Sequence, residues 1–359
     1  MNSSIENIIA RLDLQDQDSQ GDYGLWKGKA GFAIINYLLS KIKDSSIYAE
    51  KALALFNEIS EHIASVNKID FENGLIGIGW AIEWASQNNF LDVNSNEILE
   101  DVDDAIYKSV MYAPDNDFYL GTGTLGKLAY FSMRIQNNKE ALHRFKKLVF
   151  EECLVVLTDE LHDKLLEGEN SLYKGKMNGN YVYLINLGQA IIFTSKFLQK
   201  KINEPTIEKT LYRTIEFIDQ FLKLECDKLI ENKSGYSNKY LFSLQYLAVC
   251  YLGSGIYHNH TYWQREATTI LDCVLSLAPI SGIMLEEDFI QQIMVYSLYN
   301  FYCPKLSYKE KIIGLLQSID LSSLPGQLHY GKGSILLAVV GLSNMDMEIV
   351  KKLDELIWL

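Results

Sequence analysis

Residues 24–31 read Gly-Leu-Trp-Lys-Gly-Lys-Ala-Gly and open an apolar, helix-like run. Related phrases open similar runs, as Gly-Leu-Ile-Gly-Ile-Gly-Trp at 74–80, Gly-Thr-Gly-Thr-Leu-Gly at 121–126 and Tyr-Gly-Lys-Gly at 330–333. The marker glycines Gly31, Gly77 and Gly126 are separated by steps of 46 and 49 residues. A period of this size indicates a repeat architecture. Because glycine lets backbones approach closely, the phrase predicts many helices whose N-terminal ends crowd around one point.

Two kinds of helix-like segment alternate along the chain. Segments with one charged face, which predict half-exposed outer helices, span 47–66, 97–112, 139–166, 206–226, 262–278, 307–319 and 345–358. Less charged segments, which predict helices buried on most sides, span 29–44, 77–90, 125–137, 187–200, 239–253, 288–302 and 332–343. Spacing gives rough markers for repeats four to seven at Gly188, Leu244, Gln291 and Gly333. The alternation predicts seven helix pairs, and no segment has the two-residue alternation of a strand.

Seven helix pairs can either stack in a line or close into a ring. A ring explains why the less charged helices are apolar on both sides, since they would lie between an outer layer and a central core. It also explains why glycines gather at the starts of these helices, where a ring narrows. We therefore predict an all-α fold, an α/α toroid of about seven inner and seven outer helices. Residues 1–359 would form it as a single domain, with the last helix closing against the first pair.

The composition is that of a globular protein and restricts the class of partner. Hydrophobic residues make up 48% of the chain and charged residues 22%, which is ordinary. No apolar stretch reaches the roughly 18 residues of a membrane span, so no membrane insertion is expected. The formal net charge of −13 disfavours a nucleic acid and would suit a basic peptide, although an acidic excess also serves solubility alone.

The five cysteines indicate a compartment rather than a site. None forms a CxxC pair, and an odd number of cysteines is typical of a reducing cytoplasm. The first residues lack a basic segment followed by an apolar one, so no secretion signal is expected. We predict a cytoplasmic protein without a cofactor. The sequence leaves the oligomeric state open.

The glycine phrases resemble those of the lanthionine synthetase C-like (LanC-like) family, which repeats Gly-Leu-x-Gly-x-x-Gly at the starts of its inner helices. Residues 24–32, 74–81 and 328–337 carry the resemblance. It implies an α/α toroid of seven inner and seven outer helices. For the cyclases of the family it implies addition of a peptide cysteine thiol across a dehydrated serine or threonine. In those members a zinc ion lowers the thiol pKa and holds the thiolate.

The resemblance also implies a metal site that this sequence does not reproduce. The family binds zinc through a cysteine of repeat five and a cysteine and a histidine of repeat six, and a histidine of repeat four does acid or base work. The matching segments, 235–240, 284–289 and 183–188, contain neither cysteine nor histidine. A soft thiolate site cannot be built from them. We therefore expect no bound metal and no zinc-dependent cyclisation, while other enzymatic activity stays open.

One histidine and several acids precede inner helices and so are candidates for a site at the ring's mouth. His329 precedes the last inner helix, where it could act as a general base near neutral pH or could cap or pack locally. The candidate acids are Asp22, Glu72, Asp117, Glu287 and Asp288. Acids before a helix also suit its dipole without any ligand. Carboxylates at the mouth could bind a basic peptide or a hard cation such as Ca²⁺ or Mg²⁺.

Aromatic residues accompany the glycine phrases. Trp26 lies within the first phrase, and Tyr119 and Tyr330 flank the third and the last. Amphipathic rings at the mouth of a ring could hold a peptide or a sugar. The alternative is that bulky rings fill the space left by glycines.

Three functions follow from these observations. The first is a LanC-like protein without the zinc site, which binds a peptide as a non-cyclase or accessory protein in peptide modification. The second is an enzyme of different chemistry, for example a hydrolase of peptides or carbohydrates that uses His329 and the mouth carboxylates. The third is a scaffold whose outer helices dock other proteins.

Overall fold

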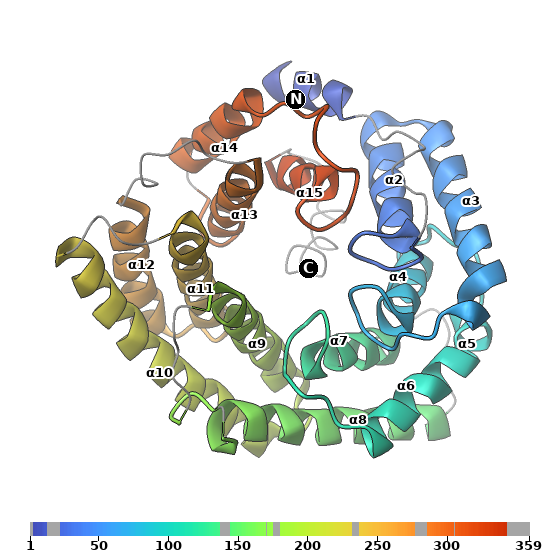
Figure 1. The fold of residues 1–359 in the computed structure, drawn as a ribbon, viewed down its shortest axis with the longest axis horizontal. Helices are drawn as coiled ribbons and strands as arrows, with labels where there is room; N and C mark the ends of the chain where they lie inside the picture. Colours follow the sequence, from blue (N-terminus) through green and yellow to red (C-terminus); the bar gives the residue numbers. More distant parts are fainter. Residues whose placement is uncertain are drawn as a thin grey trace.

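The computed structural model describes residues 3–12, 22–136, 144–169, 171–174, 180–231, 237–276, 286–304 and 306–342. Over these ranges the chain forms helices and no strand. The helices lie in two concentric rings, viewed end-on in Figure 1. The predicted α/α toroid is confirmed. Within the same ranges, no helix combines the length and the apolar character needed to cross a bilayer.

The inner ring has seven helices in the described part of the chain. They are α2 (Lys29–Lys43), α4 (Leu75–Gln87), α7 (Thr124–Ile135), α9 (Tyr181–Lys200), α11 (Asn238–Tyr257), α13 (Glu286–Tyr302) and α15 (Lys332–Leu342). Most of them begin within two residues of the predicted position. Helix α9 is the exception, because it starts at Tyr181 rather than at residue 187. The side chain of Asn180 accepts hydrogen bonds from the backbone N–H groups of Val182 and Tyr183 and so caps the earlier start.

The outer ring is formed by α3 (Ser46–His62), α6 (Glu100–Tyr112), α8 (Arg144–His162), α10 (Glu204–Glu231), α12 (Thr261–Ser276), α14 (Leu306–Ser318) and α1 (Ser3–Arg11). Helix α1 was not predicted. It packs against α14 and α15, so it occupies the part of the outer ring between the last and first repeats. The outer helix predicted at 345–358 lies outside the described residues. Short segments α5 (Ser95–Ile98), η2 (Ile63–Ser65) and the π-helical η3 (Asp163–Glu167) join the larger elements.

Burial separates the two rings as the sequence pattern predicts. Ten of the 11 residues of α15 are buried, whereas α3 buries only Ala52, Phe56 and Ile59 among its 17 residues. The ring closes because α15 packs against both α13 and α2. At roughly 1.5–3 kcal/mol for each large apolar side chain removed from water, burial in the inner helices is the main stabilising contribution.

A buried charge cluster joins neighbouring repeats. Arg134 of α7 is fully buried, and its guanidinium group donates to both carboxylate oxygens of Asp103 on α6, at 3.0 and 2.8 Å. It also pairs with the fully buried Glu83 of α4. The hydroxyl of Tyr130 donates to Asp103 at 2.6 Å. Since removing one member would leave an uncompensated buried charge, the cluster fixes the relative positions of α4, α6 and α7.

Candidate functional site

The loops before α2, α4, α7 and α15 share one backbone conformation. In each loop the first N–H group of the helix donates to the carbonyl seven residues earlier. The pairs are Lys29 to Asp22 (2.9 Å), Leu75 to Lys68 (2.9 Å), Thr124 to Asp117 (3.3 Å) and Lys332 to Pro325 (2.9 Å). Each residue of one loop therefore has a counterpart in the other three. These loops lie together on one face of the ring, which we call the mouth face (Figure 1).

A glycine stands before the first residue of each of these four helices, and space accounts for it. Gly28 and Gly74 have φ values of −108° and −112°, which any residue can adopt. A Cβ atom on Gly28 would lie 2.4 Å from the backbone nitrogen of Gly24. On Gly74 it would lie 2.5 Å from the nitrogen of Asp70. Close backbone approach, predicted from the sequence, is therefore confirmed as the reason for the repeated glycine.

Backbone hydrogen bonds link each loop to the next in one direction around the ring. Two successive N–H groups of one loop donate to a single carbonyl of the following loop. The pairs are Leu328 and His329 to Trp26 (3.0 and 3.2 Å), Leu25 and Trp26 to Glu72 (3.0 Å each), and Phe71 and Glu72 to Gly121 (2.9 and 3.0 Å). We call this series the loop zipper. It includes the contact by which the last repeat joins the first.

The loop zipper ends on a side chain. The N–H group of Leu120 donates to Oδ1 of Asn186 at 2.8 Å, and Nδ2 of Asn186 donates to the Val182 carbonyl at 2.9 Å. Asn186 lies within α9, so a helical side chain replaces the loop carbonyl used elsewhere. Gly188, the marker chosen for repeat four, has another role. A Cβ atom there would lie 2.8 Å from the Cys250 sulfur, so this glycine permits close packing of α9 on α11.

The repeat alignment needs a correction in the last copy. A Cβ atom on Gly31 would lie 2.0 Å from the Leu25 carbonyl oxygen and 3.0 Å from Cβ of Leu328. The counterpart of Gly31 in the last loop is Ser334 rather than Gly333, because Ser334 is the third residue of its helix. Its hydroxyl donates to the Leu328 carbonyl at 3.1 Å. A small polar residue therefore takes the place of the marker glycine.

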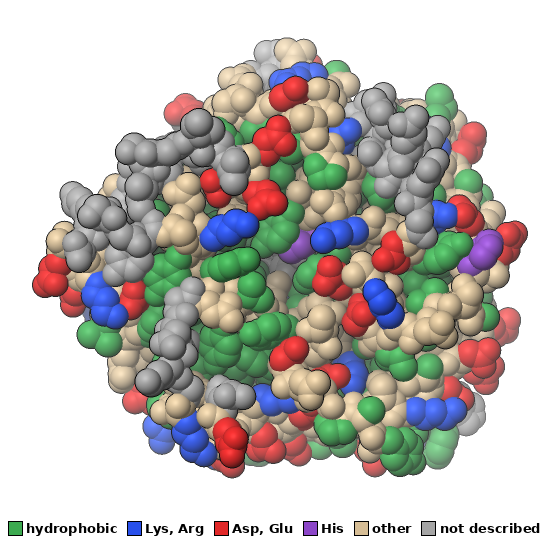
Figure 2. Space-filling model, in the orientation of Figure 1, with side chains coloured by type: hydrophobic (Ala, Val, Ile, Leu, Met, Phe, Trp, Pro, Cys, Tyr) green, Lys and Arg blue, Asp and Glu red, His purple; other side chains and the backbone are tan. Residues whose placement is uncertain are grey.

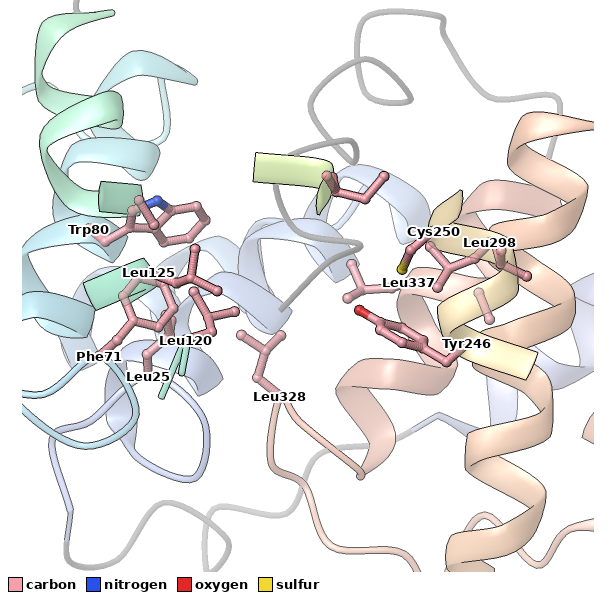
Figure 3. Close-up of a cluster of buried hydrophobic side chains, with 14 of the residues drawn as sticks. Leu25, Phe71, Trp80, Leu120, Leu125, Tyr246, Cys250, Leu298, Leu328 and Leu337 are labelled. Atoms are coloured by element: carbon pink, nitrogen blue, oxygen red, sulfur yellow. The ribbon is translucent and has the colours of Figure 1, made fainter. Parts of the chain in front are cut away.

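Equivalent loop positions divide into buried and mouth-facing sets. The buried set is Leu25, Phe71, Leu120 and Leu328, whose exposed fractions are all 2% or less. Figure 3 shows Leu25, Phe71 and Leu120 gathered together, with Leu328 approaching them from the loop before α15. The next residue of each loop is Trp26, Glu72, Gly121 or His329. Of these, Trp26, Glu72 and His329 are half-buried, so the mouth face presents a different chemical group at each repeat.

The structure brings three of the predicted site residues into one aromatic cluster. The rings of Trp26 and His329 stack with centroids 4.2 Å apart and an interplanar angle of 20°. The ring of Tyr330 lies 4.0 Å from that of His329. Burial, with smaller contributions from Tyr181 and Glu287, raises the pKa of Tyr330 to about 12. The phenol is therefore neutral near pH 7, and the cluster combines apolar faces with hydrogen-bonding edges.

The predicted acids of the first repeats differ in what their carboxylates do. Asp22 accepts a hydrogen bond from the N–H of Gly24 at 3.1 Å, and Asp117 accepts one from the N–H of Tyr119 at 2.8 Å. Both carboxylates thus stabilise their own loops. Glu72 is different, because no hydrogen bond or ion pair to its carboxylate occurs among the described residues. Its Oε2 and the ring edge of Trp26 both lie near Gly121, at 3.5 and 3.0 Å from where a Cβ atom on that glycine would stand.

On the other side of the mouth face, the starts of α11 and α13 hold the remaining acids. Glu287 is exposed and pairs with Lys239 at 3.1 Å. The Lys239 ammonium group lies 5.8 Å from the centre of the Tyr181 ring. Asp288 is buried and accepts a hydrogen bond from Asn238 at 3.2 Å. Figure 2 shows acidic, basic and hydrophobic side chains interspersed over this face.

Sequence reasoning missed two members of this side, Tyr181 and Lys239. Their signals were present: each lies in the first turn of an inner helix. Tyr119 was predicted, and it lies at the boundary between the two sides. Its ring packs edge-on against Phe118, which in turn contacts Tyr183 of α9.

The described residues at the metal positions of repeats five and six do not fit zinc. Asn238 and Asp288 border a small pocket of about 10 Å³, enough for roughly one water-sized occupant. Its other residues are Leu241, Phe242, Gln245, Gln291 and Gln292. These offer amide groups and one carboxylate, not the thiolate and imidazole donors that zinc prefers. Over the described ranges, no three His, Cys, Asp or Glu side chains are grouped so as to hold a metal ion.

Comparison with known proteins identifies related folds. A family model described as "Lanthionine synthetase C-like protein" matches residues 1–160. Among solved structures, one titled "Nisin cyclase" aligns with a TM-score of 0.66 and 15% sequence identity, covering 99% of this chain and 97% of that one. At this identity the structural likeness shows the fold. No curated protein matches the chain in sequence.

Proposed function

We propose that this chain, which belongs to the lanthionine synthetase C-like family, binds a peptide at its mouth face and serves peptide modification without zinc-dependent cyclisation. The observation that carries the proposal is the contrast within that face. The loop zipper holds an ordered aromatic cluster of Trp26, His329 and Tyr330. The segments that match the family's zinc-binding segments of repeats five and six contain neither cysteine nor histidine and bring Asn238 and Asp288 together instead. The site therefore supports holding a peptide rather than activating a thiol.

The charges on the mouth face favour a peptide with a basic side chain. The half-buried Glu72 carboxylate and the Trp26 ring both lie near Gly121. An aromatic ring attracts a cation through its face, and a carboxylate near it adds the attraction of its charge. The chain's net charge of −13 would raise the local concentration of cationic ligands. A lysine or arginine of the peptide would lie against Trp26 and pair with Glu72.

In this proposal His329 positions Trp26 by stacking against it. Its backbone N–H belongs to the loop zipper, so the imidazole is carried on a rigid part of the ring. The hydroxyl of Tyr330, protonated at neutral pH, can donate a hydrogen bond to a peptide carbonyl.

The test uses the full chain and fluorescein-labelled peptides of equal length, one lysine- and arginine-rich and one glutamate-rich. We expect fluorescence polarisation to show binding of the basic peptide, weakening as salt rises. Glu72→Gln should weaken it about 3- to 10-fold, equivalent to roughly 1 kcal/mol. Trp26→Ala should weaken it about tenfold or more. Glu61→Gln, the same change at an exposed site on α3, is the matched control.

Two results would contradict the proposal. One is equal affinity for basic and acidic peptides with no effect of Glu72→Gln, which would remove the mouth face as the binding site. The other is one zinc ion per chain, by elemental analysis of protein purified without added metal, together with cyclisation of a dehydrated peptide. That second result would show that residues other than those at the matching positions hold the metal.

A further inference from the structure

A second concave site lies on the outer wall, away from the mouth face. The end of α8, the π-helical η3 and residues 171–174 meet α10 there, around a cleft of about 280 Å³. Its lining residues are Leu166, Glu167, Tyr173, Lys209, Arg213, Glu216, Phe217 and Gln220. Its volume lies just below the range of about 300–1,000 Å³ usual for drug-sized ligands. The cleft therefore suits a small ligand.

The floor of the cleft is apolar and held in place. Tyr173 and Phe217 pack edge to face with ring centroids 5.7 Å apart, and Phe217 stacks on Phe221 at 6.3 Å. The Tyr173 hydroxyl donates to the Arg213 carbonyl at 3.2 Å, which ties the loop to α10. Such a floor can accept an aliphatic or aromatic side chain of a ligand.

The rim of the cleft carries two positive and two negative side chains. Lys209 pairs with Glu167 at 3.4 Å, and Arg213 pairs with Glu216 at 3.1 Å. All four side chains are more than half exposed, and such surface pairs contribute only about 0–1 kcal/mol each. A ligand with one negative and one positive group can therefore replace a partner in each of these ion pairs at little cost in free energy.

A buried histidine lies behind the pair of Lys209 and Glu167. The imidazole of His162 donates from Nδ1 to the Thr210 hydroxyl at 2.7 Å, because that hydroxyl donates its own hydrogen to the Thr206 carbonyl. Its Nε2 lies 3.3 Å from both Glu167 and Lys209. The pKa of Glu167 is lowered, with Lys209 as the larger cause and His162 as the next. The lowered pKa keeps the carboxylate on this side of the cleft ionised at neutral pH.

From this arrangement we propose that the cleft binds a free α-amino acid with an apolar side chain. The ligand carboxylate pairs with Arg213, its ammonium group with Glu216 or Glu167, and its side chain covers Phe217. A ligand with a single charge can pair only with the positive or only with the negative side chains of the rim, which is neutral overall. This site does not depend on the function proposed for the mouth face.

The experiment is saturation-transfer NMR and calorimetric titration of the full chain with L-phenylalanine. We expect saturable binding at millimolar concentration or below, as befits so small a ligand. N-acetyl-phenylalanine lacks the ammonium group, and phenylalanine amide lacks the carboxylate. Each should therefore bind at least about fivefold more weakly than L-phenylalanine. Glycine lacks the side chain and should not bind measurably.

Variants locate the binding. Arg213→Gln and Glu216→Gln should each reduce affinity at least about fivefold, whereas Arg265→Gln, the same change at an exposed, paired arginine of α12, should not. Glu72→Gln at the mouth face should leave amino-acid binding unchanged. Equal binding of N-acetyl-phenylalanine would overturn the proposal in favour of a simple anion site. No saturation up to about 10 mM, or unchanged affinity in both cleft variants, would overturn it as well.

Discussion

The two sides of the inner ring are built differently. Helices α15, α2, α4 and α7 have 11 to 15 residues and follow glycine loops that bond backbone to backbone. Helices α9, α11 and α13 have 17 to 20 residues, and the first two are capped by the side chains of Asn180 and Ser237. On the first side, main-chain atoms make the hydrogen bonds that join the loops. The side chains that face outward from these loops can therefore differ from one repeat to the next. Trp26, Glu72, Gly121 and His329 occupy equivalent positions there.

On the second side, side chains cap the starts of the helices. The family resemblance implies that side chains on this side would also hold the metal. By that resemblance, substitutions on this side would change a metal site without touching the backbone bonds of the glycine loops. Around Asn238 and Asp288 the described residues offer amide groups and one carboxylate, while the loops before α2, α4, α7 and α15 keep their glycines. The comparison separates what maintains the ring from what decides its chemistry.

The largest expected effect tests whether the first turn of α4 tolerates a Cβ atom at Gly77, the position that Ser334 occupies in the last repeat. In Gly77→Ala the new atom would lie 2.0 Å from the Phe71 carbonyl oxygen and 2.9 Å from Cβ of Leu25. Because backbone must move, we expect a loss of about 3 kcal/mol in the free energy of unfolding, measured by urea denaturation. Gly188→Ala meets movable side chains and should cost less.

The control for this pair is Gly314→Ala on α14, where nothing lies within 4 Å. Replacing an exposed helical glycine by alanine there should stabilise the chain by about 0.5–1 kcal/mol. If Gly77→Ala proved as mild as Gly188→Ala, the distinction between the two sides would be wrong.

The junction between the two sides gives the next effect. Asn186→Ala leaves the N–H group of Leu120 without its acceptor, so we expect a loss of about 1–3 kcal/mol. Asn186→Asp retains an acceptor oxygen and should recover most of the loss. Comparing hydrogen exchange of the Leu120 amide between the two variants tests whether the lost hydrogen bond causes the loss of stability. Equal protection in both would argue against the hydrogen bond.

A smaller effect is expected from the cap of α11. The Ser237 hydroxyl accepts from the N–H of Tyr240 at 3.2 Å, and Ser237→Ala should cost about 1 kcal/mol. Ser237→Asp preserves an acceptor and should be near neutral. Thermal unfolding of both variants measures the difference. A cost of the same size in the aspartate variant would show that the cap does not account for the start of this helix.

The smallest effect concerns Tyr330, whose pKa burial raises from its ordinary value of 10.0 to about 12. The folded state therefore binds the phenol proton more tightly than the unfolded state. The resulting stability is complete below pH 10 and is lost as the pH rises from 10 towards 12. Tyr330→Phe should lose less stability over this interval than the natural chain. Parallel pH curves for the two proteins would contradict the burial of this phenol.

The sequence predicted the parts of the fold that arise from repetition. Helix periodicity and the glycine phrases located all seven inner helices, because burial on most sides removes charged residues from a segment and close backbone contact requires glycine. It missed α1, where a helix of nine residues is too short for a clear pattern and depends on packing against α14 and α15.

The candidate site was less predictable, because its members are joined by tertiary contacts. Nothing local in Asn186 indicates that its side chain accepts from the N–H group of Leu120, 66 residues earlier, and so ends the loop zipper. Lys239 and Glu287 pair between two helices of different repeats. The stacking of His329 on Trp26 joins residues from opposite ends of the sequence. Spacing could place each residue near the mouth but could not identify its partner.

The contact of Leu328 and His329 with the Trp26 carbonyl has a consequence for biosynthesis. During translation the first glycine loop leaves the ribosome with this acceptor open, and the donors that complete it are among the later residues to be made. No nascent fragment ending before residue 328 contains them. Closure of the ring at this contact is therefore a late step, which follows synthesis of the intermediate repeats.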